Sequence, residues 1–557
     1  MRAFFFLAVV AAGCTVADAT SDLDAAIANG RRAESAPAAV DAPPEPGAVA
    51  AETEPKPKPK RPARTAPAAL AVPDGFYPRV IQRSNGTVVA SVVRFLPSGR
   101  MGATVFESND EGLSFQEIGA IDDPINDGGL CCGTLFELPR ALGGLAAGTL
   151  LWSASAGGDA PDAPMSIPIW KSADGGRTWS FLAKVATASK PRRSGGLWEP
   201  ELSLLDDGTL ACHWSDETDG AHSQKLVVAR SSDGVTWRDR HDTVALAPFG
   251  HRPGMPNVRR APGGPFVMSY EICALPNDSC TAFVRFSNDG WSWGNVNDRG
   301  LRVATIDGKH FRHAPTLSWS SAPGVNGRFI MVGQMVHDAN GAVARENGTQ
   351  LLVSSEGATH AWYMVAAPVP VPDAFDNFCP NYSSSILALE NGTVALELAS
   401  KWDGELCRTY FARGPLVDTS DGSEIEDGKT YRLVSAHSGM CLDVAGGSTA
   451  AGGDVIQWTC NGGPAQRWKV ERTATGAITL RAEVSGMLLA VAGGDVVQNP
   501  NGTAWKPRAM GTGYYTLAHE GATTCLDVAG GSTAAGGNVA EWTCNDLAPQ
   551  LWKLEAL

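Results

Sequence analysis

The octet Ser172-Ala173-Asp174-Gly175-Gly176-Arg177-Thr178-Trp179 determines the fold of most of this chain. Its pattern, Ser-x-Asp-x-Gly-x-Ser/Thr-aromatic, returns several times with small changes. Because a repeat at a regular interval indicates a repeated structural unit, the interval sets the size of that unit. Complete, shortened or degenerate copies start at serines 108, 172, 231, 287 and 354, about sixty residues apart.

Each copy has the residues of a tight turn. The aspartate and serine side chains can bond to nearby backbone groups, the glycine adopts a positive φ, and the aromatic ring packs inward. We therefore predict that the octets are structural and take no part in chemistry. Alternating apolar runs lie between them, such as residues 87–93 and 149–153, and these runs predict strands.

A repeat of this length that holds several strands is typical of one blade of a β-propeller. The predicted fold class is all-β, with a six-bladed β-propeller over residues 70–420. A second repeat follows it. Residues 441–455 and 525–539 differ only at Asp454 and Asn538, and a Gln-x-Trp motif follows each copy. The offset of 84 residues (525 minus 441) is twice 42, so we expect a third, diverged unit at residues 488–491.

Three units of this length with Gln-x-Trp resemble the ricin B-type β-trefoil lectins, over residues 428–557. The resemblance implies two sugar sites, each with an aspartate for hydroxyl groups and an aromatic ring for the apolar sugar face. The middle unit has Ala490 in place of the aspartate and should bind nothing. The implied sugar-binding residues are Asp443, Trp458 and Asn461 in one site and Asp527, Trp542 and Asn545 in the other; Gln466, Trp468, Gln550 and Trp552 are expected in the core.

The octets themselves resemble the Asp-boxes of the sialidase superfamily. Within the propeller, residues 197–202, 214–217, 252–256 and 270–271 resemble segments of the exo-acting arabinanases of glycoside hydrolase family 93. Members of that family are six-bladed propellers that retain anomeric configuration and release arabinobiose from linear α-1,5-arabinan. The resemblance thus implies a glycosidase acting on a neutral plant-type polysaccharide.

Glycoside hydrolysis needs two carboxyl groups that flank the scissile bond. The resemblance implies that Glu199 and Glu271 supply them, Glu199 as acid/base and Glu271 on the nucleophilic side, with the order left open. Tyr382 falls at the place of an active-centre tyrosine, where a neighbouring glutamate would lower its proton affinity or share its role. Strand alternation predicts that Glu199 and Glu201 face one side and Trp198 the other.

Five further residues are candidate substrate contacts: Arg79, Asp216, His251, Arg252 and Arg312. The three arginines leave open a sialidase, because a sialidase clamps a carboxylate with three guanidinium groups. A second alternative is a carbohydrate-binding adhesin whose propeller has lost catalysis.

The N-terminus predicts export. Met1 and Arg2 precede an apolar run at residues 3–12, and small residues end at Ala19, which together indicate a signal peptide over residues 1–19. The alternative is a lipid anchor on Cys14 at the cell surface. Residues 20–69 are rich in Pro, Ala and Lys and predict a disordered linker.

Removal of Cys14 leaves eleven of the twelve cysteines, an odd number that predicts at least one free thiol in an oxidising compartment. Equal spacing and similar surroundings predict the disulfides Cys441–Cys460 and Cys525–Cys544. The pairs Cys273–Cys280 and Cys379–Cys407 are weaker proposals. The partners of Cys131, Cys132 and Cys212 stay unassigned, and no metal site is predicted because neither a Cys-x-x-Cys pair nor a nearby histidine cluster occurs.

The net charge and the apolar content exclude some classes of binding partner. With 59 acidic and 45 basic residues the net charge is −14, which argues against nucleic-acid binding because that needs a basic face. The mature chain has no apolar run long enough to span a membrane. We therefore expect a secreted, monomeric protein without a cofactor, whose partners are a neutral polysaccharide substrate and a glycan on the lectin module.

Overall fold

The structure is a computed structural model that describes residues 64–305, 307–321, 328–354, 362–389, 392–416, 425–511, 514–545 and 547–557. The predicted signal peptide, most of the predicted linker and residues 355–357 of the degenerate octet lie outside the described residues. The described chain consists of strands, turns and a few short 3-10 helices, which confirms the all-β prediction. No helix among these residues has the length and apolar character needed to cross a membrane.

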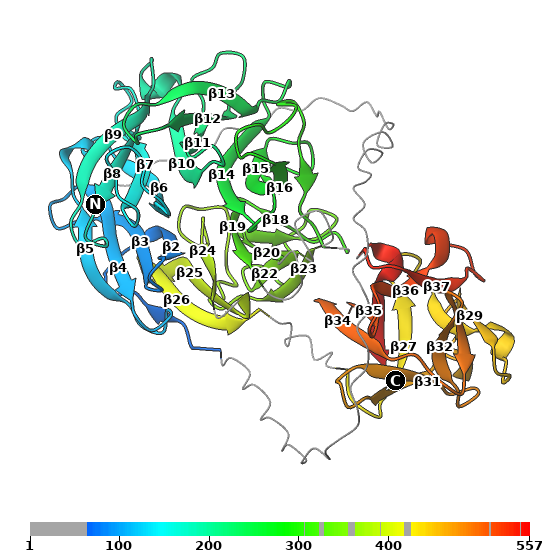
Figure 1. Cartoon of the computed structure of the whole chain (residues 1–557). Coiled ribbons are helices and arrows are strands. Elements are labelled where there is room, and N and C mark those ends of the chain that lie inside the picture. The colour runs from blue at the N-terminus through cyan, green and yellow to red at the C-terminus, as the bar shows by residue number, and fades with distance from the viewer. Residues whose placement is uncertain are drawn as a thin grey trace, which may run out of the picture. The chain divides into compact units, whose positions relative to one another are not determined.

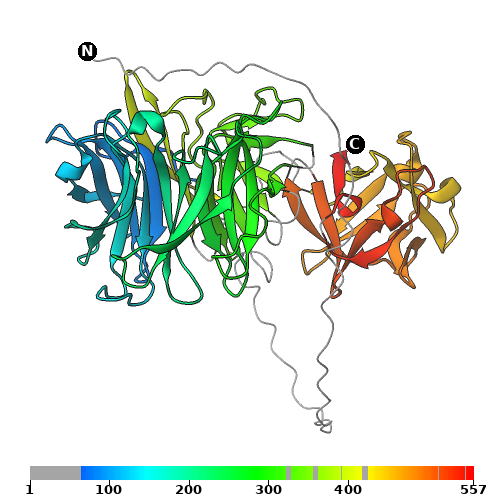
Figure 2. The ribbon, with the colours of Figure 1, turned by 90° about the horizontal axis from the view of Figure 1, so that it is seen from above.

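The six predicted blades are antiparallel sheets arranged around one axis (Figures 1 and 2). Blade 1 comprises β2 (Phe76–Gln82), β3 (Val88–Phe95), β4 (Met101–Ser108) and β5 (Gln116–Ile121); blade 2 comprises β6 (Leu130–Glu137), β7 (Leu150–Ala156), β8 (Ser166–Ser172) and β9 (Ser180–Thr187). Blade 3 comprises β10 (Leu197–Leu204), β11 (Leu210–Asp216), β12 (Lys225–Ser231) and β13 (Arg238–Val244); blade 4 comprises β14 (Arg252–Arg260), β15 (Phe266–Cys273), β16 (Thr281–Ser287) and β17 (Leu301–Arg302), with β18 (His310–Arg312) and β21 (Met335–His337) at its edge. Blade 5 comprises β19 (Thr316–Ser320), β20 (Arg328–Val332), β22 (Gln350–Ser354) and β23 (Trp362–Ala366); blade 6 comprises β24 (Ser385–Leu389), β25 (Val394–Asp403), β26 (Leu406–Pro415) and β1 (Ala68–Ala69). The 3-10 helices η1 (Pro124–Asn126) and η2 (Arg192–Ser194) lie in loops.

The two ends of the propeller chain meet in blade 6. Strand β1 pairs with β26 through Ala68 and Phe411, and the Thr65 N–H donates to the Arg413 carbonyl at 3.0 Å. The expectation that the linker continues to residue 69 is therefore wrong at its end, since residues from Thr65 onward already belong to the blade. This pairing closes the ring, because the first and last parts of the propeller share one sheet.

The octets form turns at the outer ends of the blades. In blade 2, the Ser172 hydroxyl donates to Asp174 at 2.7 Å and accepts from the Gly176 N–H at 2.9 Å. Asp174 also accepts the Thr178 N–H, and the Trp179 indole donates to the Gly176 carbonyl. These bonds lower the pKa of Asp174 to about 2 against the opposing effect of burial, so its carboxylate stays charged within the turn.

The innermost strands share a further feature that the sequence pattern did not reveal. Each blade places a non-glycine residue at positive φ two positions before regular pairing resumes after a bulge, in blades 1 to 4, or begins, in blades 5 and 6. Such backbone is rare for residues with a side chain, and it persists only where the surroundings enforce it. The six residues, one per blade, are Tyr77, Cys132, Glu199, Met255, Ala314 and Ser383.

Two positions further on, polar side chains bond between neighbouring blades. The Thr134 hydroxyl donates to Glu201 at 2.8 Å, and the Leu317 N–H donates to the Asn257 side chain at 2.8 Å. These bonds join the innermost strands of neighbouring blades. The positive-φ residues of different blades therefore lie close together near the axis. Four of them, at positions 77, 132, 255 and 314, belong to one buried cluster.

The C-terminal module forms a twelve-stranded network of three four-stranded units, which confirms the predicted third unit. The units are β27 (Thr430–Ser435), β28 (Cys441–Val444), β29 (Gly453–Trp458) and β30 (Trp468–Arg472); β31 (Ile478–Ala482), β32 (Leu488–Ala492), β33 (Asp495–Asn499) and β34 (Trp505–Gly511); and β35 (Tyr514–His519), β36 (Thr524–Val528), β37 (Val539–Thr543) and β38 (Trp552–Ala556). Short 3-10 helices follow at η4 (Ala445–Gly447), η5 (Pro464–Gln466), η6 (Ala529–Gly531) and η7 (Ala548–Gln550).

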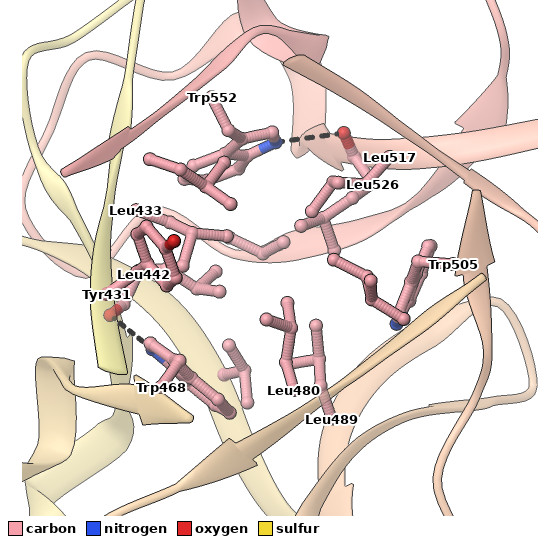
Figure 3. Close-up of a cluster of buried hydrophobic side chains, with 14 of the residues drawn as sticks. Tyr431, Leu433, Leu442, Trp468, Leu480, Leu489, Trp505, Leu517, Leu526 and Trp552 are labelled. Carbon is pink, nitrogen blue, oxygen red and sulfur yellow. Dashed lines mark hydrogen bonds between the residues drawn. The ribbon is translucent and has the colours of Figure 1, made fainter. Parts of the chain in front are cut away.

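The trefoil core holds one large tryptophan from each unit, Trp468, Trp505 and Trp552, all fully buried (Figure 3). The Trp468 indole donates to the Leu442 carbonyl, and the Trp552 indole donates to the Leu526 carbonyl, both at 3.1 Å. The Gln-x-Trp residues are therefore core residues, as predicted.

Five disulfides occur in the described chain. They confirm the pairs Cys441–Cys460, Cys525–Cys544, Cys273–Cys280 and Cys379–Cys407. The fifth joins the adjacent residues Cys131 and Cys132, and Cys212 is the free, buried thiol. The five disulfides are consistent with an extracellular protein.

Candidate active site

The bulge in β10 decides where Glu199 points. Trp198 pairs with Ser215 and Glu201 with His213, so Trp198 and Glu201 share one face, and Glu199 lies in the bulge at φ 55°. The alternation that predicted Glu199 and Glu201 on one face and Trp198 on the other is therefore wrong. A bulge adds one residue to the strand and breaks its period of two.

Hydrogen bonds hold the Glu199 carboxylate from two strands. Its Oε2 accepts the Ser215 hydroxyl at 2.6 Å and the Met255 N–H at 3.2 Å, while its own N–H donates to the Ser155 hydroxyl at 3.0 Å. Burial raises the pKa of Glu199, and the two accepted bonds oppose that rise because they stabilise the charged form. Glu199 as a whole residue is only partly buried.

Glu271 lies in β15 of the next blade. Its Oε2 accepts the Ala314 N–H at 2.8 Å, and the His313 Nδ1 lies 4.0 Å from the same oxygen. Burial, with a further contribution from the charge of Glu199, raises the pKa of Glu271 to about 8. Two carboxyl groups close enough to perturb each other, one with an elevated pKa, are the arrangement that separates an acid from a base.

Tyr382 joins the pair from blade 6. Its ring centroid lies 6.2 Å from that of Tyr77, and both hydroxyl groups lie about 4 Å from the Met255 sulfur. Burial raises the pKa of Tyr382 well above its ordinary value, and the charges of Glu271 and Glu199 raise it further. The expectation that a neighbouring glutamate lowers its proton affinity is therefore wrong, because a nearby carboxylate disfavours the phenolate.

Glu217 is a residue that sequence reasoning missed. Its Oε2 accepts the Trp198 indole and the Gly196 N–H, both at 2.9 Å, and its Oε1 accepts the Arg252 guanidinium. Burial acts to raise the pKa of Glu217, but the bonds from Trp198 and Arg252 outweigh it and lower that pKa. The Ser-Asp-Glu segment at residues 215–217 contains the signal, but the prediction from the sequence names Asp216 alone.

The structure does not support the prediction that Asp216 contacts substrate. Asp216 has no exposed surface and is held by the Thr218 N–H and hydroxyl and by Arg240, so its role is structural. Glu217 follows the last residue of β11, and its N–H donates to the Gly196 carbonyl at 3.0 Å.

Of the other predicted substrate contacts, one lies in the site and three bond elsewhere or do not reach it. Arg252 reaches Glu217 and influences the pKa of both Glu199 and Glu271, so it belongs to the site. Arg79 is buried and donates to the Pro78 and Ser383 carbonyls, which makes it a bond between blades. Arg312 donates to the Asn277 carbonyl. Among the contacts of the described residues, none joins His251 to the carboxyl groups.

The Cys131–Cys132 disulfide lies beside Glu199. Cys131 pairs with Ser155 in the ladder between β6 and β7, and the Ser155 hydroxyl accepts the Glu199 N–H. Cys132 is the positive-φ residue of its blade, at φ 63°, and both cysteines pack in the cluster of Tyr77. The disulfide thus restrains the bulge of blade 2 next to the bulge that carries Glu199.

A group of possible metal ligands occurs around Glu271. Its carboxylate, the sulfurs of Cys273 and Cys280 and a ring nitrogen of His313 lie within 4.8 Å of one another. Zinc binding needs thiolates, and these two sulfurs are bonded to each other. The oxidised protein therefore has no cysteine ligand to offer at this place.

In each of the two predicted trefoil sites, the aspartate and the tryptophan lie on one face of a strand pair. Trp458 pairs with Cys441, which puts Asp443 on the same face of β28 and β29, and Trp542 pairs with Cys525 in the same way. Both indoles are exposed, Trp458 by 43% and Trp542 by 64%, although tryptophan is usually buried. The middle unit has Asn499 at the tryptophan position and Ala490 at the aspartate position.

Internal bonds orient each aspartate. Gln466 donates to Asp443 at 2.8 Å, and burial raises the pKa of Asp443 and of Asp527. The side-chain oxygens of Asn461 and Asn545 accept backbone N–H groups of the following turns, at Gly463 and Leu547. These oxygens organise the loop beside each site.

Comparisons with known proteins agree with this architecture. Residues 422–505 and 501–557 match a family model described as ricin-type beta-trefoil lectin domain-like. The alpha-L-arabinanase of Penicillium chrysogenum, solved with arabinobiose, is 23% identical with a TM-score of 0.55, covering 64% of this chain and 99% of that one. The GH93 alpha-L-arabinofuranosidase of Fusarium graminearum, also with arabinobiose, is 24% identical with a TM-score of 0.52, covering 62% and 94%. No curated protein sequence matches the chain.

These likenesses show the fold of both parts of the chain. The propeller has the fold of the family 93 arabinanases and arabinofuranosidases, and a ricin-type β-trefoil lectin-like module follows it.

Proposed function

We propose that this protein is a secreted, retaining, exo-acting glycosidase for linear arabinan or a similar neutral polysaccharide. The observation that carries the proposal is the pair Glu199 and Glu271, two carboxyl groups that share one cluster and differ in their hydrogen bonds. The fold likeness and the lectin-like module support a glycan substrate. We propose that the trefoil holds the enzyme on its polymer.

The electrostatics favour an order opposite to that expected from the sequence. Glu271 has a pKa of about 8 and is protonated at neutral pH, whereas Glu199 accepts two hydrogen bonds that stabilise its carboxylate. Glu271 would donate its proton to the glycosidic oxygen as Glu199 attacks the anomeric carbon and the bond to the leaving sugar breaks. Glu271, now ionised, would take a proton from water, and the resulting hydroxide would release the sugar from Glu199 with retention.

The same observations weigh against a sialidase. A sialidase needs three guanidinium groups free to hold a carboxylate, but Arg79 bonds to backbone carbonyls and Arg252 is paired with Glu217. The site also holds the carboxylates of Glu199 and Glu217, which would repel an anionic sugar. A neutral substrate fits this charge.

Product analysis tests the proposal. The full chain is incubated with linear α-1,5-arabinan and, separately, with a sialoside, and early products are followed by NMR. We expect release of short arabino-oligosaccharides with retained anomeric configuration and no release of sialic acid. Inverted product would overturn the retaining mechanism, and inactivity on every glycan would favour the adhesin.

The pH dependence should report the state of Glu271. Its folded-state pKa is about 8, so the proton donor is lost as pH rises through that value. We expect kcat/KM on arabinan to fall about tenfold per unit above pH 8, and to fall at acid pH as Glu199 becomes protonated. Initial rates between pH 4 and 10 measure both limbs. An alkaline limb that persists with unchanged midpoint in residual activity of Glu271→Gln would contradict this assignment.

Removal of the vicinal disulfide should disturb catalysis without blocking substrate binding. In the double variant Cys131→Ala, Cys132→Ala, the blade 2 bulge can relax and move Ser155, which positions Glu199. We expect kcat to fall about tenfold with KM nearly unchanged, because small misplacements of reacting groups are costly. The variant Cys212→Ala, which removes the buried free thiol, is the control. A rise in KM with unchanged kcat would show that the disulfide contacts substrate instead.

A further inference from the structure

Resting on the proposed function, we propose that an aromatic ridge, formed by Phe76, Phe378 and Trp402, is an additional subsite of the propeller. It would bind a sugar unit of a neutral polysaccharide beyond those at the scissile bond.

The ridge is continuous. The Phe76 and Phe378 ring centroids lie 5.7 Å apart, and those of Phe378 and Trp402 lie 5.5 Å apart, both edge to face. Phe378 is 43% exposed and Trp402 is 39% exposed. In edge-to-face packing the edge of one ring contacts the face of the next, and Phe378 and Trp402 still keep part of their ring surface open to solvent. Apolar sugar faces stack on such aromatic surface, which proteins seldom leave exposed without a purpose.

The ridge adjoins the carboxyl cluster, formed by Glu199, Glu217 and Glu271, on two sides. Phe76 precedes Tyr77, the axial residue whose ring lies beside that of Tyr382. On the other side, the loop that carries Phe378 also carries Asp376, whose Oδ2 lies 3.8 Å from the His313 Nε2. The opposite ring nitrogen of that histidine lies 4.0 Å from Glu271. A polysaccharide bound at Glu271 would therefore have the ridge as its neighbouring surface.

The loop is held in place. The Cys379–Cys407 disulfide ties it to β26, and the Gln334 side chain donates to the Asn377 and Pro380 carbonyls at 2.6 and 3.0 Å. Trp402 pairs with Cys407 across the hairpin of β25 and β26, so one disulfide anchors both exposed rings. A fixed platform loses little conformational freedom when a sugar binds, which favours affinity.

Charge and chemistry indicate a neutral sugar as the occupant. Asp376 lies in the loop that carries Phe378, and its carboxylate can accept hydroxyl bonds and repel an anionic chain. Asp403, which follows Trp402, is paired with Arg408. Aromatic surface bordered by a few polar groups is the usual composition of a carbohydrate site. A linear polymer is favoured over a single sugar because the ridge extends over three rings.

The test compares substitutions of exposed aromatic residues in the full chain. Phe378→Ala and Trp402→Ala are measured against Phe181→Ala, which removes an equally exposed ring (43%) packed edge to face on Trp170 in the outer strand β9. We expect kcat/KM on long linear arabinan to fall about tenfold in the two ridge variants, a typical effect of losing one stacking ring. On arabinotriose it should change less than twofold, and Phe181→Ala should match the wild type on both. Equal losses on both substrates, or no loss on the polymer, would overturn the ridge.

A binding measurement separates failure of the ridge from failure of the proposed function. The full chain carrying Glu271→Gln, Trp458→Ala and Trp542→Ala is titrated calorimetrically with arabinan, galactan and xylan, with and without Phe378→Ala. Weaker binding of any of these upon Phe378→Ala supports the ridge even if arabinan is not cleaved. Equal or absent binding in both variants overturns it, as does a change from dimer to monomer upon Phe378→Ala with glycan binding unchanged, which would identify a protein contact.

Discussion

The variant Glu271→Gln is expected to lose about 10³-fold in kcat on linear arabinan, since a positioned general acid contributes on that scale. Glutamine keeps the shape of the side chain and can still face the Ala314 N–H, but its amide is too weak an acid to protonate the glycosidic oxygen. Glu199→Gln should lose at least as much, because it removes the group that attacks the anomeric carbon. Initial rates with a reducing-sugar assay measure both losses.

Glu397 provides the matched control. It is also fully buried in a blade, accepts one backbone N–H, from Val369, and has a pKa raised by burial to about 8. None of the contacts of the described residues joins it to the carboxyl cluster. We expect Glu397→Gln to keep full activity. If this variant loses as much activity as Glu271→Gln, the loss reflects a disturbed fold instead of chemistry, and the catalytic assignment fails.

The second large effect is expected in the trefoil. In the full chain, Trp458→Ala alone should weaken retention on insoluble polysaccharide by about 10²-fold, because two weak sites gain that factor when both are engaged. The double variant Trp458→Ala, Trp542→Ala should show no measurable retention. Both indoles are exposed, so their removal leaves no cavity in the core. Pull-down isotherms on insoluble polymer measure the effect.

Asn499→Ala is the control for the trefoil. Asn499 pairs with Leu488 as Trp458 pairs with Cys441, so it occupies the same place in the middle unit. We expect this variant to bind like the wild type. If Asn499→Ala reduces retention as strongly as Trp458→Ala, the middle unit binds sugar and the two-site interpretation is wrong.

Periodicity made much of the fold predictable. The octets are local: the side chain of Asp174 bonds to residues within four positions of it, so their form depends on nothing distant. The trefoil units show the same in Trp468 and Trp552, because copies of one sequence must fill equivalent places in a core. Equal spacing also paired the four trefoil cysteines correctly.

The catalytic geometry was less predictable. Alternation along β10 failed because Glu199 lies in a bulge that contacts from Ser155, Ser215 and Met255 stabilise, and these residues come from three other strands. The sequence does not distinguish Asp216 from Glu217 for a similar reason. Which of the two adjacent acids is buried depends on Arg240 and Arg252, which come from different strands.

By itself, the sequence determined the all-β class, the propeller and trefoil with their repeats, four of the five disulfides and the candidate glutamates, because these follow from local patterns and spacing. Only the tertiary structure decided that six strained residues meet on the axis, that Cys131 bonds to Cys132, and that Glu271 has a pKa of about 8 beside Glu199. Burial and mutual charge arise when separate blades pack around one axis, and no single segment contains that information.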